Sequence, residues 1–297
     1  MSAGAGFLSP KGRVLPIITV VAIVVVLWYA LAVWLNYDRV SEQLAGINPD
    51  YSVGNLIKGT WSMERPVLPA PDQIAVDLWK STAELKVTSK RSLIYHAYIT
   101  ASATLVGFAF GALLGILLAA GIVHVQTLDR SLMPWIIASQ TIPILAIAPM
   151  IIVILASVGV TGLVPKAIIS MYLCFFPVTI GMVKGLRSPD PLQMDLMRTY
   201  NASAWQIFWK LRVPASIPFL FASLKVAIAI SLVGAIVGEL PTGAEGGLGS
   251  RMLAGSYYGQ MVQIWSALVL ASVLGMAMVY SIAGIEWATL RRTGERT

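Results

Sequence analysis

Long stretches without a charged residue set the strongest limit on how this chain can fold. Such runs cover residues 14–37, 97–123, 131–165, 167–183 and 252–285. An α-helix of roughly 20 apolar residues crosses the hydrocarbon layer of a membrane, where unpaired backbone amides are costly. With 57% hydrophobic and 12% charged residues, the chain is far more apolar than a soluble domain. We therefore predict an all-α polytopic membrane protein.

About six transmembrane helices are expected. The run 131–165 is too long for one span and contains Pro143 and Pro149, so we expect one span near 132–157 that its prolines kink, followed by a turn. The first run is long for a cleavable signal and residues 34–37 offer no small-residue cleavage site, so we expect it to be retained. The other spans are expected over residues 14–37, 97–123, 167–183, 215–240 and within 252–285.

Basic residues predict how the helices are oriented. If both termini are cytoplasmic, that side collects Lys11, Arg13, Arg130, Lys184, Arg187, Arg198, Lys210, Arg212, Arg291, Arg292 and Arg296. The short loops opposite would hold only Lys166 and Arg251. Because basic loops are retained in the cytoplasm, residues 1–13 and 291–297 are expected inside and 38–93 outside. This bias accounts for most of the net charge of +7, so the charge does not call for a nucleic-acid partner.

The outer stretch, residues 38–93, has too few apolar residues to bury a core of its own. Pro71 and Asp72 are typical of a helix start, and apolar residues including Ile74 and Trp79 follow them. Tryptophan is common where a membrane meets water. We therefore expect a short amphipathic helix before the second span.

A polar hairpin, Asp190 to Pro214, separates two apolar runs and predicts a helix, a break and a second helix. Asp190 is a favourable N-cap, with Pro191 at the first helical position. One buried face is expected from the apolar residues at helical spacing, which are Leu192, Leu196, Met197 and Tyr200. Asn201 marks the break, because asparagine tolerates the left-handed conformation that ends many helices.

The second helix of the polar hairpin begins at a capping box, the Ser-x-x-Gln pattern of Ser203 to Gln206. Its aromatic residues share one side and are Trp205, Phe208 and Trp209. The helix ends with Lys210 and Arg212, where positive charge is favourable on dipole grounds.

The polar hairpin resembles the signature loop of ABC importer permeases, in which Glu-Ala-Ala precedes a glycine and Ile-x-Leu-Pro follows. The matching positions in this chain are Asp195, Leu196, Met197, Asn201, Leu211, Val213 and Pro214. Only the proline is identical, and Leu196 and Met197 are larger than alanine. The resemblance implies that these residues, with Trp205 and Phe208, form a cytoplasmic two-helix coupling loop over residues 186–214.

Three other places resemble the branch of this family that imports nitrate, sulfonates, taurine, bicarbonate and the pyrimidine precursor of thiamine. They are Leu68-Pro69-Ala70-Pro71, residues 108–115 and Gly247-Leu248-Gly249. The last segment lies near the external gate in this family, and the glycine-rich residues 242–249 predict a turn or re-entrant loop there. The resemblance implies a permease core of five spans over residues 94–290.

Partners also follow from the resemblance. It implies a permease homodimer in the lipid of a bacterial inner membrane, cytosolic ATPase subunits and an extracytoplasmic substrate-binding protein. The chain contains no Gly-x-x-x-x-Gly-Lys-Ser/Thr pattern, so ATP and magnesium are expected on a separate subunit. We expect no catalysis and no cofactor in this chain.

Glycines at every fourth position of the second span are Gly107, Gly111 and Gly115. They predict a face that another helix approaches closely, since small residues allow such contacts in lipid. Cys174, the single cysteine, is expected to be a small core residue.

Ionisable residues within spans are candidate functional groups. Lys225 could line an aqueous pathway, pair with an acidic residue or extend toward the inner surface, and Glu239 would cap the outer pore mouth. His96 and His124 bracket the second span without clustered ligands, so no metal site is expected.

Two other classes of protein were weighed. An ion-gradient-driven secondary transporter is expected to show internal repeats and acidic or histidine residues within its spans. A membrane enzyme needs converging nucleophiles, bases or metal ligands. Neither pattern is clear in this sequence. The substrate stays open between a small anion, such as nitrate, a sulfonate or bicarbonate, and a pyrimidine precursor.

Overall fold

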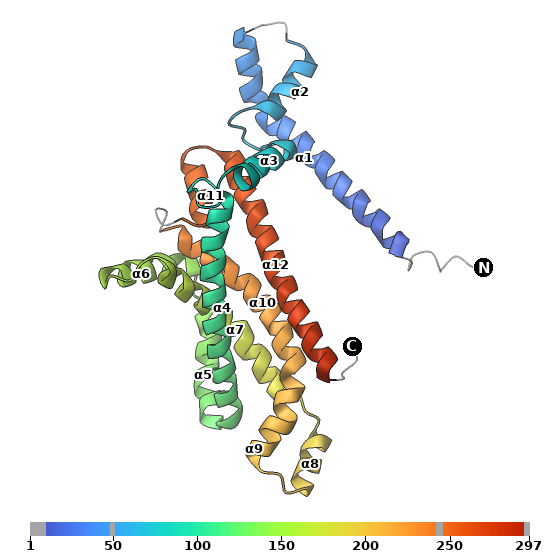
Figure 1. Cartoon of the computed structure of the whole chain (residues 1–297), viewed down its shortest axis with the longest axis vertical. Coiled ribbons are helices and arrows are strands. Elements are labelled where there is room, and N and C mark those ends of the chain that lie inside the picture. Colours follow the sequence, from blue (N-terminus) through green and yellow to red (C-terminus); the bar gives the residue numbers. More distant parts are fainter. Residues whose placement is uncertain (1–9, 48–50, 242–245, 294–297) are drawn as a thin grey trace, which may run out of the picture.

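The computed structural model describes residues 10–47, 51–241 and 246–293, whose regular secondary structure is entirely helical, without any strand (Figure 1). Residues 242–245 of the predicted glycine-rich turn, and the two ends of the chain, lie outside the described residues. The helices are α1 Pro10–Ile47, α2 Val53–Ser62, α3 Pro71–Trp79, η1 Lys80–Glu84, α4 Leu93–His124, α5 Gln126–Ser139, α6 Ile144–Ser157, α7 Leu163–Leu186, α8 Pro191–Thr199, α9 Ala204–Ile207, η2 Phe208–Arg212, α10 Val213–Glu239, α11 Leu248–Tyr257 and α12 Met261–Thr293.

Three long helices, α4, α7 and α10, pack against one another and form the centre of the fold. The two ends of this core differ (Figure 1). The short helices α8 and α9 lie at one end, and α3 and α11 lie at the other. Helices long and apolar enough to cross a membrane number five in the described residues, or six if α5 and α6 together count as one span.

Glycines bring α4 and α7 into backbone contact. A methyl group on Gly107 would lie 2.6 Å from the Ala167 carbonyl oxygen, and one on Gly111 would overlap the Cys174 sulfur. Gly115 faces the Phe175 carbonyl in the same way. Lipid supplies no hydrophobic drive for helix association, so this close packing contributes through dispersion contacts.

Serine hydroxyls link the same three helices where their backbones are close. Ser170 of α7 donates to the Ser231 carbonyl of α10 at 2.8 Å. Ser231 in turn donates to the Thr104 carbonyl of α4 at 3.0 Å. These buried bonds satisfy polar groups that would otherwise be costly within a membrane.

The first helix extends beyond its predicted span of 14–37 and continues to Ile47, so Asp38 and Arg39 lie within it. It diverges from the core and contacts α2 and α3 (Figure 1). Asn36 is fully buried there, and its side chain accepts from the Val67 amide at 2.7 Å and donates to the Leu68 carbonyl at 2.9 Å. One asparagine thereby attaches the outer stretch to α1.

The span expected near 132–157 is broken rather than kinked. Two helices, α5 and α6, meet there at 97°, and α6 projects sideways from the core (Figure 1). The break falls directly before α6, whose N-cap is Pro143. Proline lacks an amide hydrogen and disfavours helical geometry in the preceding residue, so it ended the helix here, whereas Pro149 lies inside α6.

The second helix of the polar hairpin also differs from expectation, since it does not end before Pro214. Residues 204–239 form one continuous helix. A single π-helical turn, η2, ends at Arg212, two residues before Pro214. Such a turn accommodates the hydrogen bond that proline cannot make. The last span was expected within residues 252–285. The start of this run belongs to a separate short helix, α11, and the long helix α12 begins at Met261.

Gly111→Ala tests the close contact between α4 and α7. We expect the variant to lose about 1–3 kcal/mol of stability, because the new methyl group meets the Cys174 sulfur and the Met171 carbonyl. Thermal denaturation of the purified protein in detergent measures the loss. Gly284→Ala in α12 is the matched control, since nothing lies within 4 Å of the added methyl. Equal melting temperatures for the two variants would contradict the packing.

Candidate functional site

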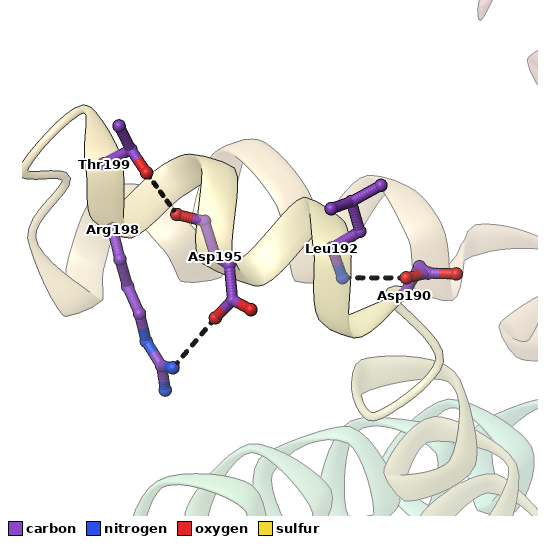
Figure 2. A network of polar contacts seen from close by, with 5 residues as sticks. All are labelled: Asp190, Leu192, Asp195, Arg198 and Thr199. Atoms are coloured by element: carbon purple, nitrogen blue, oxygen red, sulfur yellow. Dashed lines mark hydrogen bonds and ion pairs between the residues drawn. The ribbon is translucent and has the colours of Figure 1, made fainter.

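The first helix of the polar hairpin, α8, is capped by its own residues. The Asp190 carboxylate accepts from the Leu192 amide at 2.8 Å, as Figure 2 shows, and the Gln193 side chain accepts from the Asp190 amide at 3.3 Å. This is the reciprocal capping box that satisfies the first amides of a helix. The first amides of α8 are therefore satisfied by residues of the hairpin itself.

Asp195, which corresponds to the acidic position of the signature loop, bonds within α8. Its carboxylate pairs with Arg198 one turn later at 3.1 Å, and its carbonyl accepts from the Thr199 hydroxyl at 3.0 Å (Figure 2). Both charged side chains are largely exposed, so the ion pair contributes little to stability. Each is accessible to a partner.

Asn201 has φ 51°, and it is the single described non-glycine residue with positive φ. The break at Asn201 turns the chain so that a second capping box follows. The Ser203 hydroxyl accepts from the Gln206 amide at 3.3 Å, and the Gln206 side chain accepts from the Ser203 amide at 2.8 Å. The hairpin geometry thus comes from local side-chain bonds.

The expected buried face of α8 was wrong. No residue of α8, which the structure describes in full, is buried within this chain. Leu192 is 77% exposed, Leu196 is 56% exposed and Tyr200 is 78% exposed, while Met197 is partly covered. The apolar residues do recur at helical spacing, but no described part of this chain covers them.

The aromatic residues after Ser203 form a cluster at the start of the long helix. Phe208 is buried, and its ring lies 4.5 Å from that of His124, the last residue of α4. Trp209 packs edge-on against Phe208 at 5.2 Å, and Trp205 lies beside both with most of its surface exposed. Leu211 and Val213 are partly buried, and Pro214 is exposed. The cluster joins the hairpin to the end of α4.

A second polar site lies at the opposite end of the core. The Glu239 carboxylate accepts from the Thr100 hydroxyl and from the Gly249 amide, each at 2.8 Å. The Gly247 amide donates to His96 Nδ1 at 2.9 Å, and the Lys166 ammonium donates to the Gly246 carbonyl at 3.2 Å. We call the side chains of this site the outer cluster, which consists of His96, Thr100, Lys166 and Glu239.

Sequence reasoning misplaced one member of the outer cluster. Lys166 was expected in a short loop, but it lies inside α7 and is 1% exposed. Glu239 ends α10 and His96 lies in the first turn of α4, near the span ends where they were expected, and both are buried. Their partners are distant in sequence, so no local pattern indicated the cluster.

Arg251, also expected in a loop, lies in α11 and is partly covered. Burial lowers the pKa of its guanidinium, and the Asp77 carboxylate opposes this change. Its side chain therefore lies among residues of the outer stretch.

Lys225 pairs with Glu286 of α12 at 2.7 Å. Of the three arrangements left open by the sequence, the structure shows the acidic pairing. The two side chains are partly buried, and the bond connects α12 to the core helix α10. Among the described residues, no group of histidine, cysteine or acidic side chains could hold a metal ion.

Helices that could cross a membrane, packed through glycine faces and bearing a capped hairpin at one end, define a polytopic helical membrane protein with an exposed apolar helix face. Over residues 111–286, more than half of its length, the chain matches the family described as binding-protein-dependent transport system inner membrane component. It belongs to this family and is a multi-pass transport component of the inner membrane.

Curated relatives cover most of the chain. The formylaminopyrimidine transport permease protein ThiX of Halalkalibacterium halodurans is 30% identical over 74% of this chain and 83% of its own length. The putative aliphatic sulfonates transport permease protein SsuC of Bacillus subtilis is 24% identical over 75% of this chain and 77% of its own. Both are named as transport permeases, which favours a permease over the ion-gradient-driven alternative.

A solved structure shares the fold. The chain aligns with an inward-facing structure of the MetNI methionine ABC transporter at a TM-score of 0.58 and 19% identity. The alignment covers 66% of this chain and 95% of that chain. At this identity the match concerns the arrangement of helices alone.

Lys225→Met tests the ion pair between α10 and α12. The variant leaves the Glu286 carboxylate without its partner, so we expect the melting temperature of the purified protein to fall by about 5 °C or more. The double variant Lys225→Met/Glu286→Gln removes both charges and is expected to recover most of the loss. A double variant as unstable as the single one would contradict the pairing.

Asn201→Val tests the break in the polar hairpin. A β-branched residue at φ 51° is strained by roughly 1–2 kcal/mol, so we expect faster hydrogen exchange of the amides in residues 190–206. Asn201→Gly adopts this conformation without strain and is the matched control. Equal exchange in the two variants would show that the positive φ is not needed.

Proposed function

We propose that this chain is the permease subunit of an ATP-driven importer for a small solute. It acts as a homodimer with separate cytosolic ATPase subunits and an extracytoplasmic binding protein. The family description and the names of the relatives support this assignment. ATP and magnesium bind on the ATPase subunits, so this chain performs no catalysis itself.

The uncovered apolar face of α8 carries the proposal. Leu192, Leu196 and Tyr200 are exposed on α8 and its C-cap, and the hairpin's own residues cap this helix. Exposed apolar groups of this size are typical of protein interaction sites when they form a contiguous patch. A rigid amphipathic helix inserts into a groove with little loss of conformational entropy. The partner that fits is the ATPase, and the helix acts as the coupling helix.

Charge supports the orientation of this surface. Lys184 and Arg187 end α7 just before the polar hairpin, and Lys210 and Arg212 lie at its end. Under the positive-inside rule this end of the core faces the cytoplasm, with both chain termini on that side. The outer cluster and α11 then face the outside of the cell.

The continuous helix over residues 204–239 provides a mechanical link between the two ends. At about 1.5 Å per residue it is long enough to cross the membrane and extend into the hairpin. The aromatic cluster packs the N-terminal end of this helix against His124 of α4. Movement of α8 and Trp205 by the ATPase therefore tilts α10 and α4 together, and this tilt reaches the opposite end of the core.

The substrate belongs to the class of small polar solutes. The relatives are named for formylaminopyrimidine, riboflavin, aliphatic sulfonates and nitrate. They include anions and uncharged heterocycles, and the ionisable groups inside the core, Lys166, Lys225, Glu239 and Glu286, form intramolecular contacts. Selection among such solutes therefore falls mainly to the binding protein.

Leu196→Asp tests ATPase docking. Leu196 is exposed in the isolated chain, so the substitution is expected to leave expression and melting temperature unchanged. It places a charge in the interface, so recovery of the co-expressed ATPase in pull-down should fall about tenfold or more. Val53→Asp is the control, because Val53 is also an exposed apolar residue but lies in α2. Undiminished ATPase recovery with Leu196→Asp would refute the docking surface.

A further inference from the structure

The N-terminus of α11 is capped by side chains of other helices. Its N-cap residue is Gly247, which has no side chain to offer. Three successive amides donate instead across helix boundaries. Gly247 donates to His96 and Leu248 donates to Thr100, both of α4, and Gly249 donates to Glu239 of α10. All three distances lie between 2.8 and 2.9 Å.

This arrangement makes the position of α11 depend on two core helices at once. A helix usually satisfies its first amides with its own N-cap residue, as α8 does with Asp190. In α11 the acceptors belong to α4 and α10, and the Thr100 hydroxyl also donates to Glu239. If the outer ends of α4 and α10 separate, at least one of these bonds must break.

The third core helix participates through Lys166. Its ammonium donates to the Gly246 carbonyl, and the single hydrogen of the Ser250 hydroxyl lies within reach of two acceptors, the carbonyls of Glu239 and Gly246. Gly247 has φ 123°, and a methyl group there would overlap the Glu239 carboxylate. The backbone therefore lies directly on the buried carboxylate, and no larger residue fits.

We propose that Thr100, His96 and Glu239 are positioning residues for transport, forming a latch that holds α11 across the outer ends of α4 and α10. The bonds close this end of the core in the structure and are released when the end opens. The inference rests on the proposed importer function for its role in transport. The latch itself is a property of the isolated permease.

Thr100→Val is the principal test. Valine has the same shape as threonine but leaves the Leu248 amide without its acceptor. Hydrogen exchange of the amides in residues 247–250 should rise about tenfold in the purified permease. In the reconstituted complex, a weaker latch should raise basal ATPase activity several-fold and lower the solute imported per ATP hydrolysed. Simple destabilisation of the permease would instead lower both the ATPase activity and the rate of solute import.

Two variants of α4 serve as controls. Thr100→Ser keeps the hydroxyl and should restore wild-type exchange and coupling. Thr104→Val removes an equally buried hydroxyl one turn away that donates to the Thr100 carbonyl of its own helix, so it should leave both readouts at wild type. Ser250→Ala removes one hydroxyl of the latch without adding a buried group. It should change exchange and coupling in the same direction as Thr100→Val.

Several results would overturn the latch. Exchange in Thr100→Val or Ser250→Ala equal to that in Thr104→Val would show that these bonds do not hold α11. Faster exchange with unchanged import per ATP would refute the role in transport. The proposed function is tested separately: full ATPase recovery with Leu196→Asp would refute it. That result would not affect the hydrogen-exchange test of the latch, which uses the isolated permease.

Discussion

Close approach of α4, α7 and α10 is the contact on which the rest of the structure depends. Glycines such as Gly111 let the backbones meet, and this proximity brings short polar side chains within reach of neighbouring helices. Ser231 reaches the Thr104 carbonyl and Thr100 reaches Glu239 only because the helices are so near. Inside a membrane these bonds replace water as the partners of buried polar groups, so packing and polar satisfaction are achieved together.

The two candidate sites lie at opposite ends of this core and are connected by one continuous helix. The helix over residues 204–239 begins beside the aromatic cluster and ends at Glu239, where the latch begins. The two ends of the core differ in which groups are exposed. The hairpin end has an uncovered apolar face suited to a partner, whereas the other end buries its polar groups within the chain. In the proposed mechanism, a partner that binds the hairpin end can therefore break hydrogen bonds of the outer cluster without contacting them.

Much of the fold and part of the site could be read from the sequence. The capped helices at Asp190 and Ser203 and the break at Asn201 depend on bonds within a few residues, so local patterns predicted them. The glycine spacing in α4 likewise indicated a close helix contact. Periodicity also identified the apolar face of α8, but periodicity cannot tell whether a face is buried in its own chain or in another. It therefore led to a wrong expectation of burial.

By itself, the sequence determined which segments are helical, where the hairpin turns and that the chain is a membrane protein. These features follow from composition and from interactions between residues close in sequence. Only the tertiary structure decided the partners of the ionisable residues. Lys225 pairs with a residue 61 positions away, and His96 binds an amide 151 positions away. It also decided that α5 and α6 turn away from each other at 97°. These long-range contacts and this angle depend on how the helices pack, which local sequence patterns do not indicate.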